Sequence, residues 1–340
     1  MQRAVLVGLD EPLDELRQLA LAAGAGVVGV VCQRRKTPDP AWFVGKGKAH
    51  ELREKLAHFR ADLVIFDDEL TPSQTRNLEK LLETQVVDRT GLILDIFARR
   101  ARTREGKLQV ELAQLTYLSS RLTGRGEWLS RLGGGIGTRG PGETQLEVDR
   151  RRIRTRMARL RREIEEIRRH RRLHRARRRR NQWPTVALVG YTNAGKSTLF
   201  QRLSGQETRV SGQVFSTLDT IVRRVRLAAG VTVLLSDTVG FVRKLPNELV
   251  AAFRATLEEV AESDLILHVV DVSDPVWREK IRVVDGVLGD IGCEGRPRLL
   301  VLNKADQVDS IEFGTDGIPV SALAGDGIQE LKRRICVCFE

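Results

Sequence analysis

The segment from Thr185 to Phe200 constrains the fold more than any other part of the chain. An apolar run, Thr185–Val189, leads directly into Gly190-Tyr-Thr-Asn-Ala-Gly-Lys196-Ser197, and a helical pattern follows at once. This is a phosphate-binding loop in its strand–loop–helix context. Its glycines let backbone N–H groups point at phosphate oxygens, and the helix N-terminus adds a favourable dipole. We predict that Lys196 contacts the β- and γ-phosphates and that the Ser197 hydroxyl coordinates Mg²⁺.

A second apolar run, residues 233–236, ends in Asp237-Thr-Val-Gly240. A carboxylate at that strand end can bind Mg²⁺ through water. Gly240 can offer its N–H to the γ-phosphate, a bond that exists only with the triphosphate. Gly240 is therefore expected to sense which nucleotide is bound.

A third run, residues 298–302, ends in Asn303-Lys-Ala-Asp306. A buried carboxylate at Asp306 can accept hydrogen bonds from guanine N1–H and N2–H₂, donors that adenine does not present there. The stem of Lys304 can pack over the base. After residues 318–320, backbone amides of Ser321-Ala322-Leu323 can reach guanine O6. These strand ends, taken in order, resemble the motif set of the translation-factor class of GTPases.

The residues alone leave three candidates for the switch threonine. Thr217, in the segment Gln213–Thr220, is a candidate to meet Mg²⁺ and the γ-phosphate, while Thr220 and Thr208 compete with it. Many GTPases place glutamine directly after the glycine of the second motif, where it orients the attacking water. This chain has Phe241, which forms no side-chain hydrogen bond. We therefore expect slow intrinsic hydrolysis that a partner accelerates.

The first hundred residues alternate apolar runs with helical patterns. Strands are predicted at 3–8, 26–32, 62–67 and 85–88, and helices between strands imply a parallel sheet. A helix is predicted from about residue 72, with Thr71 as N-cap and Gln74 completing a capping box. The cluster Gly45–Lys48 is either a phosphate site or, as we favour, a helix start.

Two long helical patterns follow. Residues 92–122 carry Leu108, Leu112, Leu115 and Leu122 on one face, and residues 124–142 then include 8 glycines. A second long helix is predicted from about Leu146, and we expect it to form an antiparallel hairpin with the first helix. Its coiled-coil-like seam is expected to fade after Ile167 into a frayed or linker-like end. The seam consists of Ile153, Met157, Leu160, Ile164 and Ile167.

The net charge of +12 is concentrated in the second of these helices. Residues 150–180 hold 17 Arg, no Lys and 3 Glu, so the other residues together carry −2. Such a segment needs a partner rich in phosphates or another dense anionic surface. The alternative is a solvated helix face, but the segment holds too few acidic residues to form ion pairs with its arginines.

Composition excludes other classes. No apolar run is long enough to span a membrane, no signal peptide is evident, and the four cysteines are too scattered for a disulfide framework. We expect a cytoplasmic monomer without stable membrane insertion. We interpret the pair Asp67-Asp68 as a strand-end turn rather than a metal site. The five histidines lack the spacing of metal ligands.

Nearly the whole chain resembles the HflX family of GTPases. The resemblance is carried by the glycine-rich stretch 133–151, by the segments 42–48, 66–74 and 87–97, by Phe215-Ser-Thr217-Leu-Asp219, and by Asp237-Thr-Val-Gly-Phe241. It implies a ribosome-associated GTPase that binds the large subunit and its rRNA, with members that split ribosomes under stress. It also favours Thr217 as the switch threonine. In departure from the family, only 17 residues follow Leu323, and Thr220 stands where proline is frequent.

The predicted architecture is α/β: a parallel-sheet domain (1–104), a long helical hairpin with its glycine-rich loop (105–181), and a P-loop GTPase domain (182–340). The predicted activity is Mg²⁺-dependent hydrolysis of GTP to GDP and phosphate. Catalytic roles are predicted for Lys196, Thr217 and Gly240, and metal ligation for Ser197 and Thr217. The predicted nucleotide-binding residues are Gly190, Tyr191, Thr192, Asn193, Ala194, Gly195, Lys196, Ser197, Phe215, Ser216, Thr217, Leu218, Asp219, Asp237, Thr238, Val239, Gly240, Asn303, Lys304, Ala305, Asp306, Ser321, Ala322 and Leu323.

Three functions remain open. The first, which we favour, is a regulatory GTPase that splits or rescues ribosomes, with slow hydrolysis stimulated by the ribosome. The second is an assembly factor acting on precursor large subunits. The third is ATP-dependent RNA remodelling by the N-terminal domain.

Overall fold

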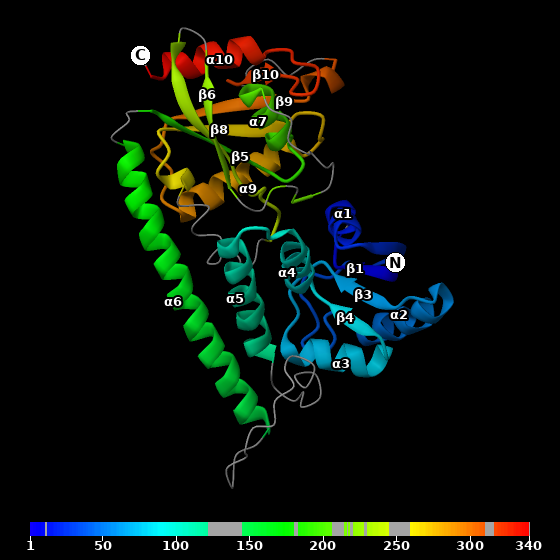
Figure 1. Cartoon of the computed structure of the whole chain (residues 1–340). Helices are drawn as coiled ribbons and strands as arrows, with labels where there is room; N and C mark the ends of the chain where they lie inside the picture. Colours follow the sequence, from blue (N-terminus) through cyan, green and yellow to red (C-terminus); the bar gives the residue numbers. More distant parts are fainter. Residues whose placement is uncertain are drawn as a thin grey trace. The chain divides into compact units, whose positions relative to one another are not determined.

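The structure is a computed structural model, and it describes residues 1–10, 12–121, 145–179, 183–205, 214–215, 217, 220–227, 230–244, 259–309 and 316–339, with the backbone alone at 145–146 and 170–179. The chain divides into two compact units (Figure 1). Unit 1 comprises residues 1–99, 107–166 and 246–252, and unit 2 comprises 100–106, 167–245 and 253–340.

Unit 1 is built on a four-stranded parallel sheet with strand order β2-β1-β3-β4. The strands are β1 (Gln2–Gly8), β2 (Ala25–Cys32), β3 (Leu63–Phe66) and β4 (Gln85–Val87). The four strands and the parallel sheet predicted from the apolar runs are thus confirmed. The core side chains include Leu6, Phe43 and Phe66, all fully buried.

Helices α1 (Asp14–Ala22), α2 (Lys46–Phe59), α3 (Pro72–Leu82) and α4 (Arg89–Arg100) alternate with these strands (Figure 1). At α3 the predicted capping box is present in both directions, since Thr71 accepts from Gln74 N–H and the Gln74 side chain accepts from Thr71 N–H. Gly45 is the N-cap of α2, and Lys48 pairs with Glu51 at 2.7 Å, as a helix start predicts.

The prediction of one long helix over 92–122 is wrong. The helical stretch divides into α4, which ends at Arg100, and α5 (Arg104–Arg121). The Thr103 hydroxyl accepts the Gly106 N–H at 3.0 Å. It thereby satisfies one of the free donors at a helix start and favours a new helix there.

Within unit 1, α5 packs against the first part of α6 (Gln145–Arg179). Ile153 and Met157 of α6 contact Leu112 and Leu115 of α5. Arg156 donates two hydrogen bonds to Glu111, at 2.7 and 2.8 Å. The chain runs in opposite directions along the two helices, as expected for a hairpin (Figure 1).

The predicted seam on α6 is confirmed at four positions, because Ile153, Met157, Leu160 and Ile164 are all buried. The expected frayed end after Ile167 is wrong, since the helical backbone continues to Arg179. Leu122 and the glycine-rich residues 124–142 lie outside the described residues.

Unit 2 contains a six-stranded sheet with strand order β10-β9-β8-β5-β7-β6. The strands are β5 (Thr185–Gly190), β6 (Ile221–Arg226), β7 (Thr232–Asp237), β8 (Leu265–Asp271), β9 (Arg298–Asn303) and β10 (Ile318–Val320). All pairs are parallel except β6 with β7, which makes the sheet mixed. The parallel strands therefore bring their C-terminal ends to one edge of the sheet.

The described helical elements of unit 2 include α7 (Lys196–Ser204), α9 (Trp277–Asp290), α10 (Ile328–Val337) and the short 3-10 helix η3 (Ala305–Gln307). Leu199, Leu203 and Leu331 are among the buried residues that form a core with the sheet. No helix among the described residues is long and apolar enough to cross a lipid bilayer.

Candidate nucleotide site

The loop between β5 and α7 requires glycine at both ends. Gly190 has φ +153, and a Cβ there would lie 2.2 Å from the carbonyl oxygen of Val269. Gly195 has φ +88, and a Cβ there would lie 2.1 Å from Asn303 Nδ2. A larger residue at position 190 would clash with the backbone of β8, and one at position 195 would clash with the Asn303 side chain. Residues with a side chain also rarely adopt these positive φ values.

Lys196 opens α7 and lies within this loop, only 6% exposed. Its Nζ donates to the carbonyl oxygens of Gly190 and Tyr191, at 3.0 and 2.8 Å. Burial lowers the pKa of Lys196 to about 8, and the nearby Asp237 carboxylate partly opposes that shift. A buried cation whose hydrogen bonds go to neutral carbonyls can be stabilised strongly by an anionic ligand.

Three oxygen-bearing side chains converge beside Lys196. The hydroxyls of Ser197 and Thr217 lie 2.7 Å apart. Both donate to Oδ2 of Asp237, at 2.8 and 2.9 Å. Burial raises the pKa of Asp237, while Lys196 and the two hydroxyls act in the opposite direction. The Oδ1 atom of Asp237 is buried and has no hydrogen-bond partner among the described residues.

Of the three threonines considered for the switch, Thr217 is the one in this cluster. The hydroxyl of Thr220 is buried without a partner in the described part of the chain. Thr208 lies outside the described residues, as do Ser216, Leu218 and Asp219 of the predicted site. Phe215 is buried, with φ +57.

The segment after Asp237 packs directly on the phosphate-binding loop. The Thr238 hydroxyl donates to the Leu188 carbonyl at 2.7 Å. A Cβ on Gly240 would lie 2.8 Å from Thr192 Cγ2 and 3.0 Å from Lys196 Nζ. Glycine therefore permits the closest approach of this segment to the loop. Phe241 is 3% exposed and belongs to the interior.

Asn303, at the end of β9, joins two parts of the site. Its Nδ2 donates to the Ala194 carbonyl at 2.7 Å, and its Oδ1 accepts the Ala322 N–H at 3.0 Å. One buried amide thus links the phosphate-binding loop to the segment 321–323. The motif indicated Asn303 as a site residue, but no local pattern predicted these two long-range bonds.

The remaining residues of the third motif lie toward the surface. Lys304 has φ +61, and its Nζ lies 2.5 Å from Asp271 Oδ2. Asp306 is exposed, so the expectation of a buried carboxylate is wrong for the protein alone, because Asp306 lies in η3, none of whose residues is buried. Ser321 and Ala322 are buried, whereas Leu323 is 74% exposed.

The structure brings together most of the predicted site residues from four strand ends in unit 2. The phosphate-binding loop and Gly240 meet at Lys196, and Asn303 connects that loop to the neighbourhood of Ser321. No cluster of three His, Cys, Asp or Glu side chains that could hold a metal occurs among the described residues. The oxygens beside Lys196 come instead from two hydroxyls and one carboxylate.

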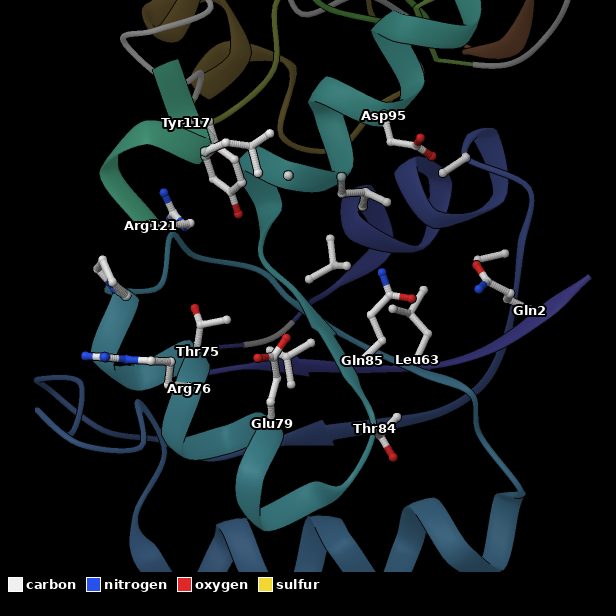
Figure 2. A pocket seen from close by; sticks show the side chains of 18 of the residues that line it. Gln2, Leu63, Thr75, Arg76, Glu79, Thr84, Gln85, Asp95, Tyr117 and Arg121 are labelled. Carbon is white, nitrogen blue, oxygen red and sulfur yellow. The ribbon is translucent and has the colours of Figure 1, made fainter. Parts of the chain in front are cut away.

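A separate cavity of about 890 Å³ lies in unit 1. Figure 2 shows Tyr117 and Arg121 of α5 on one side of it, and Gln2 of β1 and Asp95 of α4 on the other. The residues that line this cavity do not include Gly45–Lys48, so it gives that cluster no ligand site.

Comparison with known proteins assigns the chain to a family. Three family profiles match consecutive parts: "GTP-binding GTPase N-terminal" over 10–98, "GTP-binding GTPase Middle Region" over 100–178 and "50S ribosome-binding GTPase" over 185–304. The protein named GTPase HflX from Caldanaerobacter subterraneus subsp. tengcongensis is 52% identical over 341 residues, which cover 98% of this chain and 80% of the relative. The chain belongs to the HflX GTPase family. The Escherichia coli protein of the same name is 47% identical, over 94% of this chain and 77% of its own length.

A solved structure has a similar fold. The crystal structure of the complex of SsGBP with GDP covers 99% of this chain and 98% of its own, with 25% identity and a TM-score of 0.56. The resemblance stated from sequence motifs is therefore confirmed, as are the fold class and the GTPase activity. Phe241 of this HflX GTPase is buried. Its side chain forms no hydrogen bond, so it cannot orient the water that attacks GTP.

Proposed function

We propose that this GTPase binds the large ribosomal subunit and its rRNA through its N-terminal and helical regions, and that it splits or rescues ribosomes under stress. The observation that carries the proposal is the positive charge of the segment 150–180, which holds 17 Arg against 3 Glu. The family profile described as a 50S ribosome-binding GTPase supports the same partner.

Two groups can be distinguished among the described arginines of α6. Arg156 and Arg159 pair with Glu111 and Glu163. Arg154, Arg161 and Arg162 are exposed, and no acidic partner is found for them in the described part of the chain. Arg154 and Arg161 are seven residues apart and therefore lie on the same helix face. This unpaired group, which we call the α6 arginine face, is suited to phosphate contacts.

The α6 arginine face can be tested through the salt dependence of binding. Replacing Arg154, Arg161 and Arg162 with Gln should reduce the slope of log K against log salt by about 2 to 3, if each contacts one phosphate. A control variant removes the same charge at Arg53, Arg333 and Arg334, which already pair with Glu83 and Glu330. An equal slope in both variants would contradict the assignment of α6.

At the nucleotide site we propose that Mg²⁺ is held by the hydroxyls of Ser197 and Thr217, with Asp237 acting through water. The unpartnered Oδ1 of Asp237 and the short separations among these oxygens support the fit. Mg²⁺ prefers oxygen ligands and completes its shell with waters and phosphates. When bound, it would neutralise charge on the phosphates.

The remaining predicted roles are part of the same proposal. Lys196 and those amides of the loop 190–197 that do not bond within the protein hold the β- and γ-phosphates, and Gly240 contacts the γ-phosphate. Asp306 reads guanine N1–H and N2–H₂. The amides of Ser321 and Ala322 donate to Asp326 and Asn303, which leaves the Leu323 amide to meet guanine O6.

Intrinsic hydrolysis is proposed to be slow because Phe241 is buried and cannot orient water. A ribosomal partner then supplies or orders the missing group. Single-turnover hydrolysis should accelerate when large subunits are added. An equal rate with and without ribosomes would contradict this part of the proposal.

The most direct test of the splitting role is sedimentation of 70S ribosomes. With GTP or a non-hydrolysable analogue, the protein should convert 70S particles into separate subunits and remain on the large one, whereas GDP should not support this. Intact 70S particles together with preferential binding to precursor subunits would indicate an assembly role instead.

We also propose that the chain acts as a cytoplasmic monomer with three functional parts. These are the α/β domain at 1–104, the hairpin at 105–181 and the GTPase domain at 182–340. The three consecutive profile matches, which break near residues 99 and 180, support this division.

A further inference from the structure

Tyr191 connects the phosphate-binding loop to the segment that follows Gly240. It is the second residue of the loop and only 4% exposed. Its hydroxyl accepts the backbone N–H of Arg243 at 2.7 Å, across 52 residues of sequence. Its own carbonyl oxygen accepts from Lys196 Nζ at 2.8 Å. One residue therefore contacts both the phosphate-binding lysine and the backbone beyond the switch glycine.

Two backbone hydrogen bonds reinforce this connection. Phe241 N–H donates to the Gly190 carbonyl at 3.1 Å, and Thr192 N–H donates to the Phe241 carbonyl at 2.7 Å. They form an isolated parallel bridge between Tyr191 and Phe241. Together with the Tyr191 hydroxyl, three hydrogen bonds hold residues 241–243 against the loop. We call this arrangement the Tyr191 clamp.

The clamp determines where Gly240 lies. Gly240 immediately precedes the bridge, within van der Waals reach of Thr192 and Lys196. Both backbone groups of Phe241 are engaged in the bridge, so neither is directed at a ligand. In this segment the Gly240 N–H is left to meet the γ-phosphate. Its position depends on how firmly residues 241–243 are held.

The ring of Tyr191 is also fixed on its other side. Lys280 of α9 lies over the ring, with Nζ 4.8 Å from the centroid, and it forms an ion pair with Asp274. A cation over an aromatic face is attracted to the ring and restricts its orientation. The hydroxyl is thereby aimed at Arg243 N–H rather than left free to rotate away.

We propose that Tyr191 is a positioning residue for GTP hydrolysis, whose hydroxyl holds residues 241–243 on the phosphate-binding loop and so presents the Gly240 amide to the γ-phosphate. The clamp matters more in this chain because Phe241 offers no side-chain group to order the site. It acts on the triphosphate alone, because GDP has no γ-phosphate for Gly240 to contact. A tyrosine that merely fills the interior would affect both nucleotides equally.

Tyr191→Phe separates these alternatives, because it removes the hydroxyl and keeps the ring and the backbone. The full chain is titrated with GDP and with a non-hydrolysable GTP analogue, and hydrolysis is followed in a single turnover. Loss of one hydrogen bond predicts about threefold to tenfold weaker binding of the analogue and a slower turnover, with GDP affinity changed less than twofold.

The chain offers a matched control, because Tyr117 and Tyr191 are its two tyrosines. The Tyr117 hydroxyl donates to Asp88 at 2.7 Å within unit 1. Tyr117→Phe should lower thermal stability and leave the ratio of the two nucleotide affinities unchanged. An unchanged ratio in Tyr191→Phe would overturn the proposal.

A second measurement needs no variant at position 191. With 3-fluorotyrosine incorporated, the wild-type chain should give two fluorine resonances, and Tyr117→Phe identifies one of them. The Tyr191 resonance should differ between the GDP-bound and analogue-bound protein, while the Tyr117 resonance should not. A Tyr191 resonance at the same position in both states would mean that the ring does not respond to the γ-phosphate, and this would contradict the positioning role even if Tyr191→Phe failed to fold.

Discussion

Asn303→Ala tests whether one buried amide holds the nucleotide site together. The Asn303 side chain is 2% exposed and forms two hydrogen bonds, from Nδ2 to the Ala194 carbonyl and from the Ala322 N–H to Oδ1. Alanine removes both partners. The Ala194 carbonyl and the Ala322 N–H would then remain in the interior without the bonds that satisfy them.

The magnitude follows from these two groups. Leaving a buried donor or acceptor unpaired costs about 1–3 kcal/mol for each. Asn303→Ala should therefore destabilise unit 2 by roughly 2–6 kcal/mol, a large part of the stability of a typical domain. Because the phosphate-binding loop loses its link to segment 321–323, affinity for GDP should also fall by about tenfold or more.

Hydrogen exchange measured by mass spectrometry can localise this loss. Peptides that cover β5 and β9 should exchange faster in Asn303→Ala, while peptides of unit 1 should not change. Asn77→Ala is the matched control, because the Asn77 side chain also donates to a backbone carbonyl, that of Ala41 at 3.0 Å, but in unit 1. If Asn303→Ala retained wild-type exchange in β5 and wild-type GDP affinity, the linking role of this amide would be refuted.

Three further changes probe separate features. Gly195→Ala should abolish measurable GDP binding in a fluorescence titration, because its Cβ would lie 2.1 Å from Asn303 Nδ2 at a φ of +88; near-normal binding would contradict the packing. Burial lowers the pKa of His268 to about 3, so the folded chain excludes a proton that the unfolded chain binds below pH 6.5. This exclusion costs nothing above pH 6.5, and below it the free energy of unfolding should fall by about 1.4 kcal/mol per pH unit toward pH 3. Urea unfolding of His268→Leu should show a weaker loss of stability at low pH, and a pH profile identical to that of the wild type would contradict this role of His268. Thr71→Ala should destabilise unit 1 by about 1 kcal/mol, measured by exchange in the α3 peptides, and no change would mean that the capping box with Gln74 is unimportant.

The strand–loop–helix segment 185–204 was predictable because its chemistry restricts residues locally. Gly190 and Gly195 are required by backbone conformation and close contact, so the motif carries its own structural reason. The same holds for the capping box at Thr71, where both partners lie within one turn of helix. The strands of unit 1 were likewise predictable from continuous apolar runs, as expected for a parallel sheet covered on both faces.

The features that escaped prediction depend on residues far apart in the chain. Asn303 bonds to residues 109 and 19 positions away, and Tyr191 to one 52 positions away, and no local pattern encodes such pairs. The antiparallel strand β6 was missed because adjacent arginines, Arg223 and Arg224, interrupt the alternation that would indicate a strand. The exposure of Asp306 depends on the turn at η3, which the motif alone does not specify.

The central claim is that Asp306 reads a guanine ring held above the loop that contains Lys196. The most direct test is to titrate wild type and Asp306→Asn with the triphosphates of guanosine, xanthosine and adenosine. Xanthine carries an oxygen where guanine carries the N2 amino group, so an asparagine amide can donate to it. The wild type should prefer GTP, and Asp306→Asn should bind GTP about 10- to 100-fold more weakly and gain affinity for the xanthosine nucleotide. Undiminished GTP binding by Asp306→Asn would contradict the assignment of the base-reading site.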